Sequence, residues 1–166
     1  MKQLKTIILV VTAFWFSQSI KAQEKVAHVD VKEIMDKIPD MQDAQKQLEK
    51  LRESLTAEYK KMENDYQIKY NKYSSNISSQ TIEETIKSRS KELEMMRDKM
   101  EEFVKNAETK MIDKDNELEK AILDKISKSI IKVGRAKGFL YVLNKSDTLL
   151  SDGPDLTADV KKDLGI

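Results

Sequence analysis

"LRESLTAEYKKMENDYQIKYNKYSSN", residues 51–76, holds four tyrosines among mostly charged or polar residues and contains no glycine or proline. It belongs to a longer segment, residues 41–133, that lacks both residue types and is rich in Glu, Lys, Leu, Met and Gln. Because these residues favour helices while Gly and Pro interrupt them, the whole segment is predicted to be helical. With 36% charged and only 6% aromatic residues in 166, the chain has little material for a conventional globular core. An elongated or oligomeric, mainly helical protein is therefore favoured.

One interruption divides this helical segment. "SSNISSQ", residues 74–80, gathers turn-prone residues, and Thr81 with Glu84 has the spacing of a capping box that begins a new helix. The segment is therefore predicted to be a hairpin of two helices, at about 41–76 and 82–137, with its tip near 74–81. Gly138 is predicted to end the second helix in the left-handed conformation.

Short apolar stretches at the two ends of the chain predict strands. "VAHVDV" (26–31) precedes a short helical turn that includes Ile34, and "FLYVLN" (139–144) and "TLLS" (148–151) are two further candidates. Thr157 is a candidate N-cap for a closing helix, "ADVKKDL". The predicted fold is mainly α with a small β part. Residues 23–40 and 134–166 form a base, from which residues 41–133 project as a helical hairpin arm.

The N-terminus has the layout of a secretory signal peptide. Lys2 and Lys5 precede an apolar run, Ile7 to Phe16, and a polar stretch that ends at Ala22. The run is about half of the ~20 residues that span a bilayer, so cleavage after Ala22 is favoured over a retained anchor. Residues 1–22 hold three lysines and no acidic residue, which leaves 27 basic and 29 acidic side chains after cleavage. Such a nearly neutral chain does not favour nucleic acid as a partner.

Apolar residues recur along both helices at steps of three and four. In the first helix they form an eleven-residue repeat, which predicts a nearly straight packing seam. That seam comprises Leu48, Leu51, Leu55, Tyr59, Met62, Tyr66, Tyr70, Tyr73 and Ile77. In the second helix it comprises Leu93, Met96, Met100, Phe103, Ala107, Met111, Leu118 and Ile122, with Lys114 at a seam position.

The seam has two interpretations. Ordinary coiled-coil packing is favoured for its basal half. Towards the tip, tyrosine and methionine replace leucine, and both adapt to varied apolar partners, so this part is predicted to hold unstructured chains. The candidate residues of this client-binding face are Tyr59, Met62, Tyr66, Tyr70, Tyr73, Ile77, Ile82, Ile86, Met96, Met100 and Phe103.

Residues suited to catalysis or metal binding are scarce. There is no cysteine, and the single histidine, His28, is interpreted as a strand residue at a subunit surface. The carboxylates and the basic residues 87–99 alternate along one helix, which indicates ordinary pairing within it. None of the four glycines lies in a phosphate-binding motif. No enzymatic activity, metal site or cofactor is predicted.

The order of these parts resembles the OmpH/Skp family of periplasmic chaperones over essentially the whole mature chain. The resemblance rests on "VAHVDVKEIM", "AQKQLEKL" (44–51), "AKGFLYVLNKS" and "DLTADVKKDL". It implies a homotrimer shaped like a jellyfish, in which terminal strands of three subunits form a β-barrel base and three arms enclose a cavity. The implied base residues are Val26, Val29, Val31, Phe139, Tyr141, Val142, Leu143 and Leu149.

The resemblance implies an ATP-independent periplasmic holdase that binds unfolded outer-membrane β-barrel proteins and prevents their aggregation. A weak contact with the membrane surface stays open as a further interaction. The alternative is a structural coiled-coil adaptor of the cell envelope that binds one folded partner. The two hypotheses differ in whether the arm recognises unfolded chains in general or a single folded protein.

Overall fold

The computed structural model describes residues 26–76 and 82–166. The chain is divided into two compact units, one joining the residues up to Lys37 with Lys125–Ile166 and the other formed by Ile38–Asp124. They are called here the base unit and the arm unit. The predicted signal peptide, and the part of the predicted tip that includes Ile77 and Thr81, lie outside the described residues.

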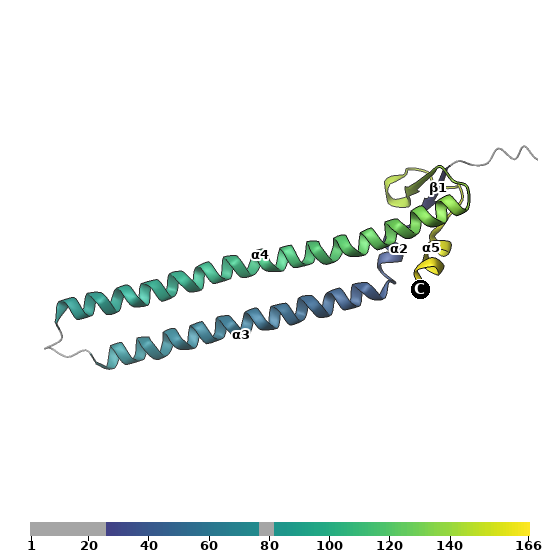
Figure 1. The fold of residues 1–166 in the computed structure, drawn as a ribbon. Coiled ribbons are helices and arrows are strands. Elements are labelled where there is room, and N and C mark those ends of the chain that lie inside the picture. Colours follow the sequence, from purple (N-terminus) through teal and green to yellow (C-terminus); the bar gives the residue numbers. More distant parts are fainter. Residues whose placement is uncertain (1–25, 77–81) are drawn as a thin grey trace, which may run out of the picture. The chain divides into compact units, whose positions relative to one another are not determined.

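The described chain is mainly helical with a small β part, as predicted. Its elements, in chain order, are β1 (Val26–Val29), α2 (Val31–Met35), α3 (Pro39–Ser75), α4 (Glu83–Ala136), β2 (Tyr141–Asn144), the 3₁₀ helix η1 (Lys145–Asp147) and α5 (Thr157–Leu164) (Figure 1).

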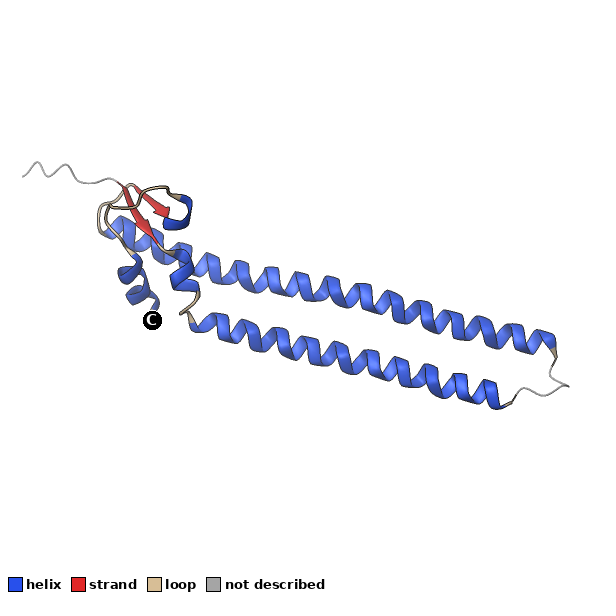
Figure 2. Cartoon of the chain, turned by 180° about the vertical axis from the view of Figure 1, so that it is seen from behind, coloured by secondary structure: helices blue, strands red, loops and turns tan. Residues whose placement is uncertain are grey.

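The arm unit contains α3 and the larger part of α4, which run antiparallel side by side (Figures 1 and 2). Both helices begin and end within two residues of their predicted limits. Pro39 occupies the start of α3, where a helix needs no donor from its first backbone nitrogen. Gly138 has a φ of 80° and follows the end of α4, which confirms the predicted left-handed stop.

The predicted seam is the less exposed side of both arm helices. Its described residues are buried or half-buried, except for the exposed Tyr70, and Lys114 at the interrupted position is also half-buried. Among the described residues between 39 and 124, only Ala44, Leu55 and Ile122 have 9% exposure or less. Most of the apolar surface along the arm therefore stays in partial contact with water.

The base unit has a small core of its own. Strands β1 and β2 are parallel and paired from Val26 opposite Tyr141 to Val29 opposite Asn144. Their pairing brings the two ends of the chain together. The buried apolar side chains of this unit come from β1, α2, the end of α4 and the α5 region: Ala27, Val29, Ile34, Ile126, Val133, Leu156 and Val160.

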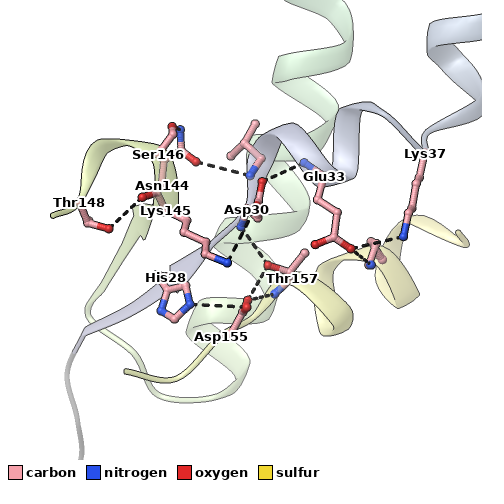
Figure 3. Close-up of polar contacts among 12 residues, drawn as sticks. His28, Asp30, Glu33, Lys37, Asn144, Lys145, Ser146, Thr148, Asp155 and Thr157 are labelled. Atoms are coloured by element: carbon pink, nitrogen blue, oxygen red, sulfur yellow. Dashed lines mark hydrogen bonds and ion pairs between the residues drawn. The ribbon is translucent and has the colours of Figure 1, made fainter. Parts of the chain in front are cut away.

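A chain of hydrogen bonds joins the N-terminal and C-terminal parts of the base unit (Figure 3). The Asp30 side chain caps α2 by accepting a hydrogen bond from the Glu33 amide at 2.9 Å. The Asp30 amide donates to the Thr157 hydroxyl at 2.9 Å, and that hydroxyl donates to Asp155. Lys161 in α5 donates to the Glu33 carboxylate at 2.6 Å, so two contacts fix α5 beside α2.

The β part is smaller than the sequence predicts. Strand β1 stops at Val29 because Asp30 caps α2, which makes Val31 helical. Strand β2 begins at Tyr141 and so excludes Phe139. "TLLS" (148–151) is wrong as a strand, since it follows η1 as irregular chain. Thr157 is the first residue of α5 instead of its N-cap, a position that Leu156 takes.

His28 is not at the surface of the single chain, contrary to the prediction. It is 7% exposed in β1, with its Nε2 3.5 Å from an Asp155 carboxylate oxygen. Its amide donates to the Pro154 carbonyl and its carbonyl accepts from the Leu156 amide, each at 2.9 Å. Residues 154–156 thus cover the edge of β1 that faces away from β2.

Gly134, near the end of α4, permits a close approach to β2. A Cβ atom at this position would lie 2.9 Å from Cγ2 of Val142, which is closer than such atoms normally come.

We expect Gly134→Ala to lower the stability of the base by roughly 1 kcal/mol, because overpacking costs about 1–3 kcal/mol and outweighs the better helix propensity of alanine. Thermal unfolding measures the change. Gly153→Ala is the control, since its Cβ would meet nothing within 4 Å, and equal melting temperatures would contradict the prediction.

Candidate binding surfaces

The arm unit has an apolar groove between α3 and α4. Its volume is about 520 Å³, within the range of small-molecule binding sites. Leu55 and Tyr59 contribute to it from α3, and Phe103, Ala107 and Met111 from α4. The rings of Tyr59 and Phe103 lie 6.5 Å apart between centroids, which joins the two helices at the groove. This is where the arm can best receive apolar side chains from another molecule.

The groove continues towards the tip as a more polar hollow of about 380 Å³. The two hollows share Tyr59 and Val104 in their linings. Charged and amide side chains contribute most of the additional lining, namely Glu63, Gln67, Arg97 and Glu101. Both hollows lie within Ile38–Asp124. Because they share lining residues, they form one path along the hairpin, and the first hollow is the more apolar of the two.

The predicted client-binding residues are distributed unevenly along this path. Tyr59, Tyr66, Met100 and Phe103 line the hollows. Met62, Tyr73 and Met96 are half-buried, and Tyr70, Ile82 and Ile86 are exposed. Tyr66 and Tyr70 stack on each other within α3, with centroids 6.2 Å apart. The structure thus brings four of the candidates to the two hollows and leaves the remaining described candidates beside the hollows or nearer the tip.

Sequence analysis missed Val104 and Ile112, two residues at the margin of the groove. Both line it, yet their exposed fractions are 40% and 61%. Val104 follows Phe103 and Ile112 follows Met111, and both preceding residues belong to the predicted seam. Because the seam was drawn as one line of residues, it left out Val104 and Ile112. The signal that could have found them is the pair of consecutive apolar residues, which widens an apolar stripe on a helix.

Nearer the tip, the contact between α3 and α4 is polar and centred on Glu92. One oxygen of its carboxylate accepts from Lys69 and the other accepts from the Tyr73 hydroxyl, both on α3. The hydrogen bond from Lys69 and then that from Tyr73 lower the pKa of Glu92 below its usual value of 4.5. Sequence analysis assigned the acidic residues of this region to pairing within one helix; for Glu92 that is wrong, because its partners lie across the hairpin.

Arg89 adds two contacts to this polar region. Its guanidinium lies 5.1 Å from the centroid of the Tyr73 ring, within the range of a cation–π interaction. It also donates to the backbone carbonyl of Asn76 at 3.3 Å, beyond the last turn of α3. Four side chains, Lys69, Tyr73, Arg89 and Glu92, therefore form a connected network. It is called here the tip network.

The base unit exposes large apolar side chains in the segment 140–150. Leu140, Tyr141 and Leu143 are 65%, 64% and 46% exposed, and Leu149 and Leu150 are exposed still more. Of the other predicted base residues, Val26 is exposed and Val31, Phe139 and Val142 are half-buried. Val29 is only 2% exposed in the single chain, so it belongs to the core and not to a surface that another molecule could cover.

Within residues 26–76 and 82–166, no group of three or more His, Asp or Glu side chains is arranged to hold a metal ion. Among the helices of the same residues, none combines the length and the apolar character that a membrane crossing requires.

Comparison with known proteins assigns the family. The family model described as outer membrane protein (OmpH-like) matches residues 25–164. A crystal structure from Caulobacter crescentus CB15, of a protein described as a proposed OmpH-like outer membrane chaperone, has a TM-score of 0.72 and 10% identity, over 85% of this chain and 83% of the other. No curated protein matches the sequence. The structural similarity supports the same fold, and the family match covers nearly the whole chain. The chain therefore belongs to the OmpH-like family of outer membrane proteins.

Proposed function

We propose that this chain is an ATP-independent periplasmic holdase chaperone, without enzymatic activity or cofactor, that binds unfolded outer-membrane β-barrel proteins and prevents their aggregation. The apolar groove of the arm is the observation that carries the proposal. Its lining includes the apolar or aromatic side chains of Leu55, Tyr59, Phe103 and Met111. The described part of the chain shows none of the clustered side chains that would hold a catalytic metal.

The groove suits weak and reversible capture of unfolded chains. Strands of outer-membrane barrels alternate apolar and polar residues, so an extended unfolded segment presents an apolar side chain about every 6.6 Å. Successive seam residues of α4 at the groove, Phe103, Ala107 and Met111, are spaced by about 6 Å along a helix. The similar spacing lets several apolar side chains enter together. Each contact is weak, and multiple arms supply the affinity through avidity.

Assembly into a homotrimer through the base is the second part of the proposal. Residues 154–156 cover one edge of the two-stranded sheet by their contacts with His28, whereas β2 forms its other edge. A two-stranded sheet is marginal alone, and an unpaired edge invites a strand from another molecule. The exposed side chains of Tyr141, Leu143 and Leu149 provide the apolar surface that such an association would bury. Three copies closing into a barrel would remove every sheet edge.

Export to the periplasm places the protein where such clients are found. The predicted signal peptide, residues 1–22, supports this location, as does the membership of the OmpH-like family. The proposed partners are unfolded outer-membrane β-barrel proteins and further copies of this chain. Nucleic acid is not a proposed partner, because the mature chain carries nearly balanced charge.

A light-scattering assay tests the chaperone proposal. A denatured β-barrel membrane protein is diluted into buffer with the mature chain, and we expect scattering to be suppressed at stoichiometric amounts without ATP. Undiminished aggregation would contradict the proposal. Selective binding of one folded envelope protein, with no effect on denatured proteins, would instead support the coiled-coil adaptor.

Replacing the two groove-margin residues by aspartate tests the site itself. We expect the Val104→Asp, Ile112→Asp double variant to weaken client binding at least about tenfold, because charges would meet the apolar side chains of the client. Both positions are exposed, so the fold should persist. Fluorescence titration with a labelled denatured client measures the dissociation constant. Met95→Asp is the control, since Met95 is also an exposed apolar residue of α4 but does not line either hollow. Equal affinities for the double variant and the control would exclude the groove as the binding site.

A further inference from the structure

The contact between α3 and α4 is apolar at the groove and polar at the tip network. At the groove, α3 and α4 meet through apolar side chains such as Leu55 and Phe103. At the tip network they meet through the Glu92 carboxylate, which accepts from Lys69 and Tyr73 of the other helix. The tyrosine pair nearby does not join the helices, because Tyr66 and Tyr70 both belong to α3. Of the contacts that join α3 and α4 near the tip, the two hydrogen bonds from Lys69 and Tyr73 therefore converge on one acidic residue.

Four other ion pairs between described residues of the arm unit have a different arrangement. Each of the following joins residues three or four positions apart on one helix: Asp43 with Lys46, Glu49 with Arg52, Glu101 with Lys105, and Lys114 with Glu117. Such pairs support a helix locally and leave its distance from a neighbouring helix unchanged. Only a pair that crosses the hairpin, as Lys69 with Glu92 does, holds α3 and α4 together.

We propose that the tip network is a polar clasp, centred on Glu92, that holds the outer end of the hairpin closed and limits the entry of clients into the hollows between α3 and α4. The clasp is open to solvent, with 36% of the Lys69 and 38% of the Glu92 side chain exposed. Its contacts are therefore weak enough to break and reform in the native protein. Because Lys69 and Tyr73 share one carboxylate, loss of that charge weakens both contacts at once.

The clasp has a defined pH range. Hydrogen bonding to Lys69 and Tyr73 lowers the pKa of Glu92 below 4.5. The stability that the ionised Glu92 gives to the clasp is therefore present at neutral pH and is lost as the pH falls through the lowered pKa. The hydrogen bond to Glu92 raises the pKa of Tyr73 above 10.0. The stability that the Tyr73 hydroxyl gives to the clasp is therefore lost only at strongly alkaline pH. The charged groups that act on Glu92 are Lys69 and Lys72 of α3, and Arg89 lies against the ring of Tyr73. Acid should therefore open the clasp.

Amide hydrogen exchange tests the clasp without any client. In Glu92→Gln we expect exchange at residues 69–76 and 83–92 to increase roughly threefold or more at neutral pH, because local opening exposes those amides. Tyr73→Phe should show a smaller increase, since Lys69 retains its partner. Glu101→Gln is the matched control: it also removes a carboxylate of α4 whose pKa is lowered, but that carboxylate pairs with Lys105 in the same helix. Equal exchange in Glu92→Gln and Glu101→Gln would overturn the clasp.

A second measurement tests the effect on clients, and this part of the inference rests on the proposed chaperone function. We expect Glu92→Gln to capture a labelled denatured β-barrel protein about twofold faster or more in stopped-flow fluorescence. Glu117→Gln should match the wild type, because Glu117 pairs with Lys114 within α4 and lines neither hollow. Faster exchange with unchanged capture would overturn the role in client entry. If the wild type binds no client, the chaperone proposal fails, while the exchange data still decide whether the clasp exists.

Discussion

Leu143→Asp is expected to convert the assembled protein into single chains that keep their own fold. The Leu143 side chain is 46% exposed in β2, so a charge there disturbs the single chain by only about 0.5 kcal/mol. In the proposed trimer the same position lies against another copy, and an unpaired carboxylate would be removed from water without a partner. Light scattering coupled to size exclusion should show the mass falling to one third.

Leu143→Ala provides the comparison for this result, because it shortens the side chain without adding a charge and should weaken assembly less. Circular dichroism should show the same helical content in both variants and the wild type. If the aspartate variant keeps the mass of the wild type, the apolar surface of segment 140–150 does not mediate assembly. If the wild type itself is monomeric, the trimer proposal is wrong irrespective of the variant.

Val29→Asp is expected to have a larger effect of a different kind, namely unfolding of the base unit. Val29 is 2% exposed within the core of one chain, so the carboxylate would be buried without a partner in every oligomeric state. A loss of more than about 4 kcal/mol is a large part of the ~5–15 kcal/mol that stabilises a typical domain. Amide hydrogen exchange should show lost protection at residues 26–35 and 157–164.

The matched control is Lys32→Asp, which places the same residue at an exposed position of α2. It should leave the protection of both segments almost unchanged. Native-like protection in Val29→Asp would show that the core of the base tolerates a charge and would contradict the description of Val29 as a core residue. Together with Leu143→Asp, this variant separates folding of the base from its assembly, although both residues come from strands of one small sheet.

The arm could be predicted almost completely from sequence because its determinants are local. The absence of Gly and Pro between residues 41 and 133, with Pro39 before and Gly138 after, fixes two long helices and their outer limits. Steps of three and four between apolar residues identify the side on which each helix is less exposed. The groove was predicted only in part, because Val104 and Ile112 line it from outside the regular seam and widen the apolar stripe beyond a single line of residues.

The base was predicted less well because its structure depends on contacts between distant residues. His28 is buried by residues 154–156, and nothing in the local sequence around a histidine reveals a partner so far along the chain. Leu149 and Leu150 suggest a strand by composition, but in the single chain η1 precedes them and both side chains stay exposed. Strand propensity without a neighbouring strand is a weak signal. Glu92 was missed for a similar reason, since the residues that contact it lie on the other helix.

The order in which the chain is synthesised matters for a base that joins its N-terminal and C-terminal parts. The segment that follows β1 contacts Thr157 and Lys161, which emerge last among the structured elements. A chain under synthesis can therefore form the helices of its hairpin long before it can close its core. A product interrupted ahead of residue 154 would retain those helices but present Val29 and Ile34 uncovered, which makes it a recognisable target for proteases.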